Sequence, residues 1–198
     1  MTPLDFSGFL RSVIDTLERL GLTYAIGGSV ASSIYGDPRS TRDVDISVVL
    51  AVDESYRFAA AFEQLGYYCP FDVVLDALIA NQPFNIIDAV SGFKADIFLV
   101  SPDAPSDHEQ AILQRRRREI YNDRTRATAV LYSPEDVIVY KLKYYVMGQI
   151  PKHLRDIAGI LVAQGEQLDL DYVAHWAARV GAGTVWQQVL DAYLDSRP

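Results

Sequence analysis

One stretch of the sequence most constrains the fold: residues 27–49, GGSVASSIYGDPRSTRDVDISVV. The short apolar run before it, residues 22–26, is typical of a strand, and two glycines then interrupt it. Residues 30–35 favour a short helix, and a Gly-Asp-Pro turn leads to a second apolar, β-branched run at residues 46–50. The pattern predicts strand, glycine turn, helix, turn and strand, with two aspartates at the start of the second strand.

The two aspartates, Asp43 and Asp45, are expected to project side by side. Residues i and i+2 of a strand point to the same face, so Val44 between them points into the protein. Two like charges held close together raise the pKa of one group unless a cation neutralises them. Because Mg²⁺ prefers oxygen ligands, the pair predicts a magnesium site.

The glycine turn supplies the second requirement of a phosphate site. Gly27, Gly28 and Ser29 precede the short helix, and glycine allows backbone N–H groups to approach an anion closely. The positive N-terminal end of the helix is aimed at the same place. The turn is therefore predicted to bind phosphates on one side of the site, with the metal on the other.

This stretch resembles the nucleotidyltransferases of the DNA polymerase β type, whose pattern is strand, GG or GS, helix, and then DxD on the next strand. It is most similar to small bacterial and archaeal members, including the AbiEii-like toxins of toxin–antitoxin systems, which carry GG followed by R-x-T-x-D-x-D. The matching residues are Gly27, Gly28, Ser29, Arg39, Thr41, Asp43 and Asp45. The resemblance covers the first half of the chain well and the C-terminal helices loosely.

The resemblance implies an α/β (α+β) fold, with a mixed, twisted sheet flanked by helices, and an activity. The expected reaction is metal-dependent transfer of a nucleoside monophosphate from an NTP to an acceptor hydroxyl of RNA, protein or a small molecule. Two Mg²⁺ ions, with Mn²⁺ as a substitute, would bind Asp43 and Asp45. Gly27, Gly28 and Ser29 would hold the β- and γ-phosphates. A toxin-like member would also have an antitoxin partner.

A third carboxylate is expected from a later strand, as in the resembling enzymes. Asp96 lies within the apolar run 93–100, where a lone aspartate is unusual because strands are depleted in it and burial is costly. Asp96 would complete the metal site and orient the attacking group. The competing interpretation pairs Asp96 with a neighbour such as Lys94, and Asp88 is the other candidate for third carboxylate.

Several cations are candidates for contacts with the nucleotide. Arg39, Thr41 and Arg42 lie beside the DxD, where they either touch phosphates or shape the turn. Lys141 follows from the resemblance, in which a lysine on the helix after the catalytic sheet contacts phosphates; the alternative is a surface lysine. Arg155-Asp156 is either part of the wall on the nucleotide side or a structural ion pair.

The remaining periodicities predict further elements and a boundary. A catalytic domain of residues 1–132 would be followed by a helical segment of residues 133–198. Helices are expected at residues 4–20, 53–65, 72–80, 108–118, 134–145, 152–163, 169–180 and 184–194, and strands at 84–90, 93–100, 120–121 and 127–132.

Composition bounds the classes of function. The chain of 198 residues has a net charge of −8, which argues against a general DNA-coating protein. A single cysteine, no secretory signal pattern and no apolar run of about 18 residues predict a cytoplasmic protein without a membrane partner. The one concentrated positive charge, Arg115 to Arg118, either binds a triphosphate or nucleic acid or is a solvated helix end.

Three functions therefore compete. The first is the nucleotidyltransferase just described. The second is a relative that binds nucleotides but has lost turnover, against which Asp43, Asp45 and Asp96 argue. The third is an antibiotic nucleotidyltransferase of the aminoglycoside type, whose cationic substrate suits the negative net charge, although the run Arg115 to Arg118 argues against it.

Overall fold

The computed structural model describes residues 5–103, 105–122 and 125–195. The chain forms two compact units. The first contains the described residues up to Gly27 together with Ser40–Leu131, and the second contains Gly28–Arg39 and the described residues from Tyr132 onward. The domain boundary between residues 132 and 133 stays a prediction; the second unit additionally includes the segment that follows the glycine turn.

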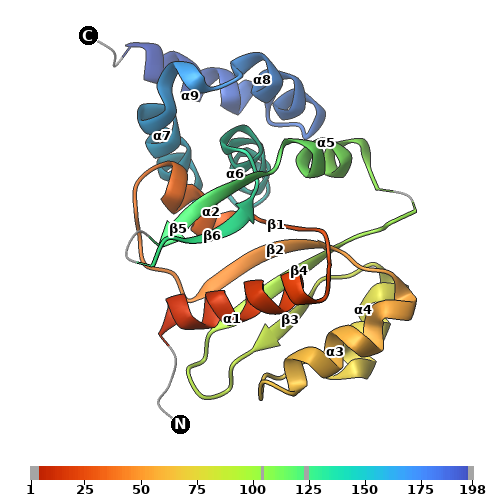
Figure 1. The fold of residues 1–198 in the computed structure, drawn as a ribbon. Coiled ribbons are helices and arrows are strands. Elements are labelled where there is room, and N and C mark those ends of the chain that lie inside the picture. The colour runs from red at the N-terminus through yellow and green to blue at the C-terminus, as the bar shows by residue number, and fades with distance from the viewer. Residues whose placement is uncertain (1–4, 104, 123–124, 196–198) are drawn as a thin grey trace. The chain divides into compact units, whose positions relative to one another are not determined.

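A mixed sheet with strand order β3-β4-β2-β1-β6-β5 forms the centre of the first unit (Figure 1). Adjacent pairs β1–β2, β3–β4 and β5–β6 are antiparallel, whereas β2–β4 and β1–β6 are parallel. The strands are β1 (Tyr24–Ile26), β2 (Asp43–Val49), β3 (Phe84–Ile87), β4 (Lys94–Val100), β5 (Arg117–Asn122) and β6 (Ala127–Leu131). This mixed sheet with its helices confirms the predicted α/β class.

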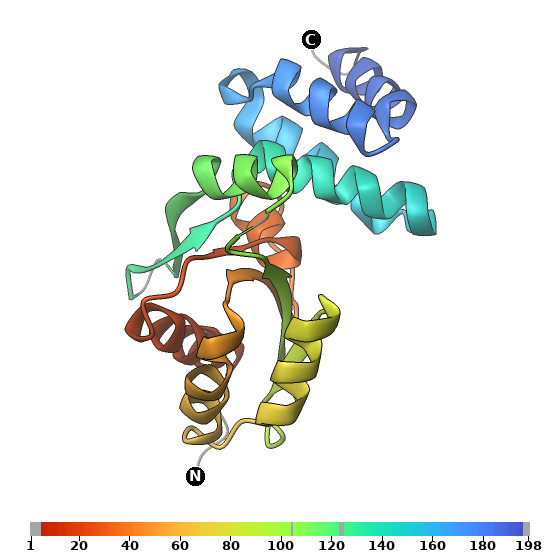
Figure 2. The ribbon, with the colours of Figure 1, turned by 90° about the vertical axis from the view of Figure 1, so that its right-hand side faces the viewer.

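The helices of the first unit are α1 (Phe6–Arg19), α3 (Ser55–Glu63), α4 (Phe71–Ala80) and α5 (Asp107–Arg115). Figures 1 and 2 show α1, α3 and α4 gathered around strands β2, β3 and β4. Asp5 caps α1 by accepting a hydrogen bond from the N–H of Gly8. The predicted first helix is confirmed, although its expected first residue, Leu4, lies outside the described residues.

Strands β2 and β4 separate an apolar face from a polar one. Val44, Ile46, Ala95 and Ile97 alternate along the two strands and are completely buried. They form one side of the core of the first unit, so the intervening residues of both strands must point to the opposite face. That opposite face begins with Asp43, and it is where the sequence predicts chemistry.

The second unit is helical. It contains α2 (Gly28–Tyr35), α6 (Pro134–Gly148), α7 (Lys152–Gln164), α8 (Leu170–Arg179) and α9 (Gly183–Asp195). Ser133 and Asp169 accept hydrogen bonds from backbone N–H groups and cap α6 and α8. The four helices predicted after residue 133 are confirmed, with small differences at their ends.

A close backbone crossing joins the turn after α2 to α7. A Cβ atom at Gly36 would lie 2.8 Å from both the carbonyl carbon of Gly159 and the backbone nitrogen of Ile160. A Cβ atom at Gly159 would lie 3.0 Å from Oδ2 of Asp37. Glycine is needed at position 36, because a side chain there would push the two backbone segments apart, whereas a side chain at position 159 would have to displace Asp37.

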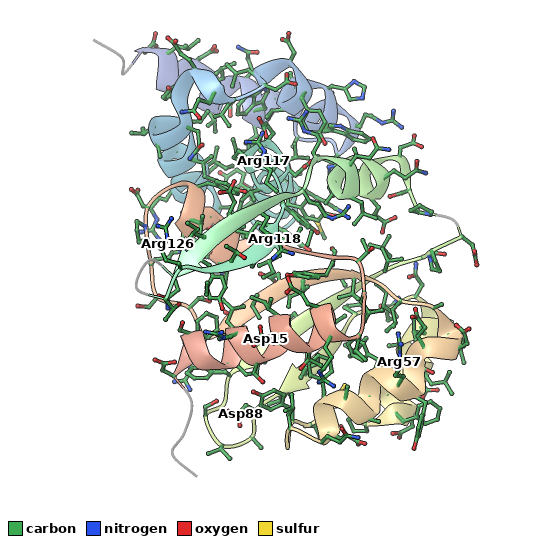
Figure 3. The ribbon with its side chains drawn as sticks, in the orientation of Figure 1. Asp15, Arg57, Asp88, Arg117, Arg118 and Arg126 are labelled. Carbon is green, nitrogen blue, oxygen red and sulfur yellow. The ribbon has the colours of Figure 1, made fainter. Side chains whose placement is uncertain are left out.

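The arginine run Arg115 to Arg118 is not one helix end. The predicted helix 108–118 is wrong beyond Arg115, because Arg116 has an extended backbone and Arg117 already pairs with Leu131 of β6. Successive strand residues alternate in direction, and Figure 3 draws Arg117 and Arg118 on opposite sides of the strand. Arg118 forms an ion pair of 2.9 Å with Glu18. The four charges are therefore divided between the last residue of α5, the linking residue Arg116 and the two faces of β5.

Among the described residues, no helix combines the length and apolarity that crossing a bilayer requires.

Candidate active site

Three aspartates share the polar face of β2 and β4. Parallel pairing places Asp45 opposite Asp96 and Asp43 opposite Lys94. Paired residues of neighbouring strands lie about 4.8 Å apart and project to the same side. The structure therefore brings Asp43, Asp45 and Asp96 onto one surface, although Asp96 is about fifty residues away along the chain. We refer to these three residues and Lys94 as the carboxylate face.

Lys94 places an ammonium group within the carboxylate face. Its Nζ donates to both carboxylate oxygens of Asp96, at 2.9 Å to Oδ1 and 2.8 Å to Oδ2. The hydrogen bond to Asp96 and the charges of Asp43 and Asp45 raise the pKa of Lys94, although partial burial opposes the shift. Asp96 thus lies beside Asp45 and is paired with its neighbour Lys94, as the competing interpretation expects. Its part in a metal site stays a prediction.

Two local contacts fix the first aspartates of the face. The hydroxyl of Thr41 donates to Oδ1 of Asp43 at 2.7 Å, which orients that carboxylate. The N–H of Gly27, just after β1, donates to the carbonyl oxygen of Asp45 at 2.9 Å. Thr41 therefore acts on the site through Asp43, and the first glycine of the turn extends the pairing of β1 with β2.

Arg42 and Asp88, two other candidates, support a turn. Arg42 donates to the carbonyl oxygen of Ser91 at 2.8 Å, and its guanidinium lies 5.5 Å from the centre of the Phe93 ring. Strand β3 ends at Ile87, so Asp88 lies in the turn before β4, where Figure 3 labels it. The Ser91 hydroxyl donates to Asp88 and, despite burial, lowers the pKa of its carboxyl group. Asp88 is accounted for as a turn residue.

A second group of ionic side chains lies in the second unit. Lys141 of α6 contacts Asp156 of α7 at 2.5 Å, and Arg39 contacts the same carboxylate at 3.3 Å. Arg39 also donates a short hydrogen bond to the hydroxyl of Ser29 at the start of α2. We call Ser29, Arg39, Lys141 and Asp156 the ion cluster. The alternative that Lys141 is a surface lysine is wrong, because its side chain is only 5% exposed.

The ion cluster has a positive balance. Burial alone would raise the pKa of Asp156, but the hydrogen bond and charge of Lys141, with the charge of Arg39, lower it below its ordinary value. Burial and the cations Lys141, Lys152 and Arg39 lower the pKa of His153, one turn before Asp156. Two cations around one carboxylate leave positive charge beside the first turn of α2, where backbone N–H groups are available to an anion.

Gly28 begins α2 with a positive φ of 57°, a conformation that favours glycine. This explains why the second glycine of the predicted turn is needed. Gly27 lies in the first unit and Gly28 in the second, so the peptide bond between them joins the strand that pairs with β2 to the helix of the ion cluster.

The carboxylate face fits a divalent cation in its donor chemistry. Oxygen donors on adjacent strands are the ligand type that Mg²⁺ and Mn²⁺ bind. Within residues 5–103, 105–122 and 125–195, however, no three acidic, histidine or cysteine side chains are grouped as a ready metal site. Because Lys94 donates to both oxygens of Asp96, Asp43 and Asp45 are the better candidates to hold a metal.

Sequence reasoning missed parts of both groups. Asn85 of β3 pairs with Asp96 and is exposed, which extends the polar row Asn85–Asp96–Asp45 across three strands. Asp156 was expected only as one half of an ambiguous Arg-Asp pair, yet it accepts from both Arg39 and Lys141. No signal in the sequence indicates the contact of Asp156 with Lys141, because it depends on how α6 and α7 cross.

Comparison with solved structures shows the fold. The solution structure of the antibiotic-resistance factor ANT(2'')-Ia aligns over 93% of this chain and 95% of its own, with 12% identity and a TM-score of 0.59. The crystal structure of ANT(2'')-Ia with adenylyl-2''-tobramycin aligns over 86% of this chain and 96% of its own, with 13% identity and a TM-score of 0.57. The chain has the nucleotidyltransferase fold.

A further structure, the lincosamide antibiotic adenylyltransferase LnuA with lincomycin bound, aligns over 76% of this chain and 95% of its own at 16% identity, with a TM-score of 0.49. No protein-family model matches the sequence, and no curated protein does. The similarity therefore lies in the fold, and the AbiEii-like resemblance remains a prediction from the motif.

Proposed function

We propose that this protein is a metal-dependent nucleotidyltransferase, which transfers a nucleoside monophosphate from an NTP to an acceptor hydroxyl. The observation that carries the proposal is the register of β2 and β4, which pairs Asp45 with Asp96 and leaves Asp43 on the same face. A structural sheet has no need for three aspartates on one surface, because like charges side by side destabilise it. The fold shared with ANT(2'')-Ia supports the same reaction class.

In this proposal the carboxylate face serves the reacting phosphorus. Asp43, fixed by Thr41, and Asp45 would hold a divalent cation, Mg²⁺ or Mn²⁺, which supplies charge stabilisation to the phosphoryl group. Asp96 would orient the acceptor hydroxyl and accept its proton as the new ester bond forms. Pyrophosphate would leave from the nucleotide in the same displacement.

The ion cluster and the glycine turn would serve the β- and γ-phosphates. Arg39 and Lys141 supply positive charge, and Gly28 and Ser29 supply backbone N–H groups at the start of α2. Asp156 would keep the two cations in place when no nucleotide is bound. The first unit would thus bind the metal and the second would bind phosphates. The chain passes from one unit to the other at the peptide bonds Gly27–Gly28 and Arg39–Ser40.

Two acceptor classes follow from different observations. The resemblance of the motif to AbiEii-like toxins favours RNA or protein, with an antitoxin as partner. The alignment with ANT(2'')-Ia along 95% of that chain favours a small cationic acceptor, since that protein was solved with adenylyl-2''-tobramycin. The net charge of −8 also suits a cationic molecule.

The deciding experiment incubates the protein with each α-labelled NTP, Mg²⁺ and one of two acceptor pools, total RNA or a panel of aminoglycosides. We expect label to pass to one pool with the wild-type protein and not with Asp45→Asn. EDTA should abolish transfer, and Mn²⁺ should restore it.

The alternatives have distinct outcomes in the same assay. Transfer of the label to RNA supports a toxin-like function, and transfer to an aminoglycoside supports an antibiotic-modifying function. NTP binding without transfer to RNA or to aminoglycosides would favour a nucleotide-binding relative that lacks turnover. Equal transfer by Asp45→Asn and wild type would refute the assignment of the carboxylate face.

A further inference from the structure

The inference concerns Lys94, which sequence reasoning treated only as a partner of Asp96, and it rests on the proposed function. Lys94 lies two residues before Asp96 on β4 and opposite Asp43 on β2. Asp43, Asp45, Lys94 and Asp96 are thus the four corners of a two-by-two patch on one face of two parallel strands. Three corners carry a negative charge and one carries a positive charge.

The ammonium group of Lys94 contacts Asp96 through both of that residue's oxygens. The two distances, 2.9 Å to Oδ1 and 2.8 Å to Oδ2, are those of charge-assisted hydrogen bonds. The side chain of Lys94 is 41% exposed and that of Asp96 is 20% exposed, so Lys94 reaches inward from the edge of the patch. A metal ion that used Asp96 as a ligand would have to share its oxygens with this ammonium group, and the two positive charges would repel each other.

The charge balance of the patch gives the consequence. With Lys94 in place, the three carboxylates retain a net charge of minus two, which one divalent cation neutralises. A second divalent cation would make the patch positive and would compete with Lys94 for the oxygens of Asp96.

We propose that Lys94 takes the place of one of the two metal ions that the resemblance implies, so that the protein binds a single divalent cation through Asp43 and Asp45. Lys94 is then a positioning residue: it holds Asp96 in a fixed orientation beside Asp45. The site would need less free metal for full occupancy than a site that fills two positions in succession.

The test counts bound metal ions directly. Mn²⁺ is titrated into the 198-residue chain without nucleotide, and free Mn²⁺ is followed by its electron paramagnetic resonance signal. We expect one bound ion per wild-type chain and a second bound ion in Lys94→Met. Lys94→Arg, which keeps the charge, should remain at one ion.

Matched variants separate the outcomes. Lys143→Met removes a lysine that lies over the Tyr140 ring in the other unit and should leave the count at one. A thermal melt in EDTA reports whether Lys94→Met still folds. We expect it to melt lower than the wild type without metal and to gain more from added Mn²⁺, because the ammonium group beside the three carboxylates is lost.

Two results would overturn the role of Lys94 alone: two ions in the wild-type protein, or one ion in a folded Lys94→Met variant. The wild-type count decides the question even if the variant does not fold. Absence of any Mn²⁺ binding, or binding that persists in Asp43→Asn/Asp45→Asn, would instead overturn the proposed function and this inference with it.

Discussion

The carboxylate face and the ion cluster both gather charges, yet they differ in burial and in sign. Asp43, Asp45 and Asp96 are half-buried on a sheet surface and outnumber their cation, Lys94. In the ion cluster, Asp156 is outnumbered by Arg39 and Lys141, and Lys141 is buried. An excess of negative charge suits a metal, and an excess of positive charge suits phosphates, so each region has the charge that its proposed role requires.

The difference also separates stability from function. A buried charge must be paired, because removing its partner leaves an uncompensated ion away from water. A half-exposed carboxylate that lies among other carboxylates is stabilised little by them, because like charges repel each other. We therefore expect the ion cluster to contribute to folding and the carboxylates of Asp43 and Asp45 to contribute almost nothing.

The sharpest test of this comparison replaces one charge in each region. Lys141→Met should lower the free energy of unfolding by about 3 kcal/mol, because it leaves the carboxylate of Asp156 buried with Arg39 alone. Asp45→Asn should change it by less than about 1 kcal/mol, since it removes one of several like charges. Urea denaturation of both variants measures the two values.

Lys143→Met is the control for Lys141→Met, because Lys143 is exposed and lies 5.6 Å from the Tyr140 ring. It should cost less than about 1 kcal/mol. The double variant Lys141→Met/Asp156→Leu should recover much of the loss, as apolar pairs of similar volume often replace buried ion pairs. Equal losses for Lys141→Met and Asp45→Asn would remove the distinction between the two regions.

The ion cluster also depends on the crossing of Gly36 and Gly159. Gly36→Ala should lower the free energy of unfolding by about 2 kcal/mol, because its Cβ would lie 2.8 Å from backbone atoms that cannot move independently. Gly148→Ala is the matched control: its Cβ would meet only the Ile150 side chain at 3.5 Å, and alanine favours a helix. Thermal and urea unfolding check the sign; a neutral Gly36→Ala would mean that the crossing is looser than described.

A third comparison sets the two arginines beside the DxD against each other. Arg39→Gln should weaken binding of an NTP by about tenfold, because a charge of the ion cluster is lost. Arg42→Gln should leave NTP affinity unchanged, because Arg42 contacts Ser91 and Phe93 in the turn before β4. Calorimetric titration with a non-hydrolysable NTP analogue measures the affinity of both variants. An equal loss of affinity in the two would indicate that Arg42 also contacts the nucleotide.

The sequence predicted the carboxylate face better than the ion cluster, for a physical reason. Period-two alternation in a strand determines which residues share a face, so the predicted strand already places Asp43 and Asp45 on the same side. Asp96 could be predicted because it is the one acidic residue in the apolar run 93–100. What alternation does not contain is the register between strands, and the pairing of Asp43 with Lys94 became visible only in the structure.

Helix contacts are harder to predict because they depend on how whole helices cross. Nothing in the helical periods of residues 134–148 and 152–164 indicates that Lys141 and Asp156 meet, or that Gly159 lies against Gly36. The arginine run shows a related limit. Helix propensity extends through Arg118, but pairing of Arg117 with β6 overrides it.

The smallest expected effect is a difference in acid sensitivity that isolates Asp156. Its pKa is lowered in the folded protein, so the unfolded chain binds a proton more readily near the ordinary value of 3.8. The stabilisation it provides is complete above that value and is lost as the pH falls through it toward the lower folded pKa. Asp156→Asn has no such proton to take up. Its free energy of unfolding should therefore decline less steeply than that of the wild type when urea denaturation is repeated at falling pH from about 5 to about 3.

Asp88→Asn offers a second measurement of the same sign, because Ser91 lowers the pKa of Asp88 in the first unit. If the free energies of unfolding of the wild type and of Asp156→Asn fall in parallel with pH, the contacts of Asp156 with Lys141 and Arg39 do not favour its ionised form. The ion cluster would then contribute no electrostatic stabilisation.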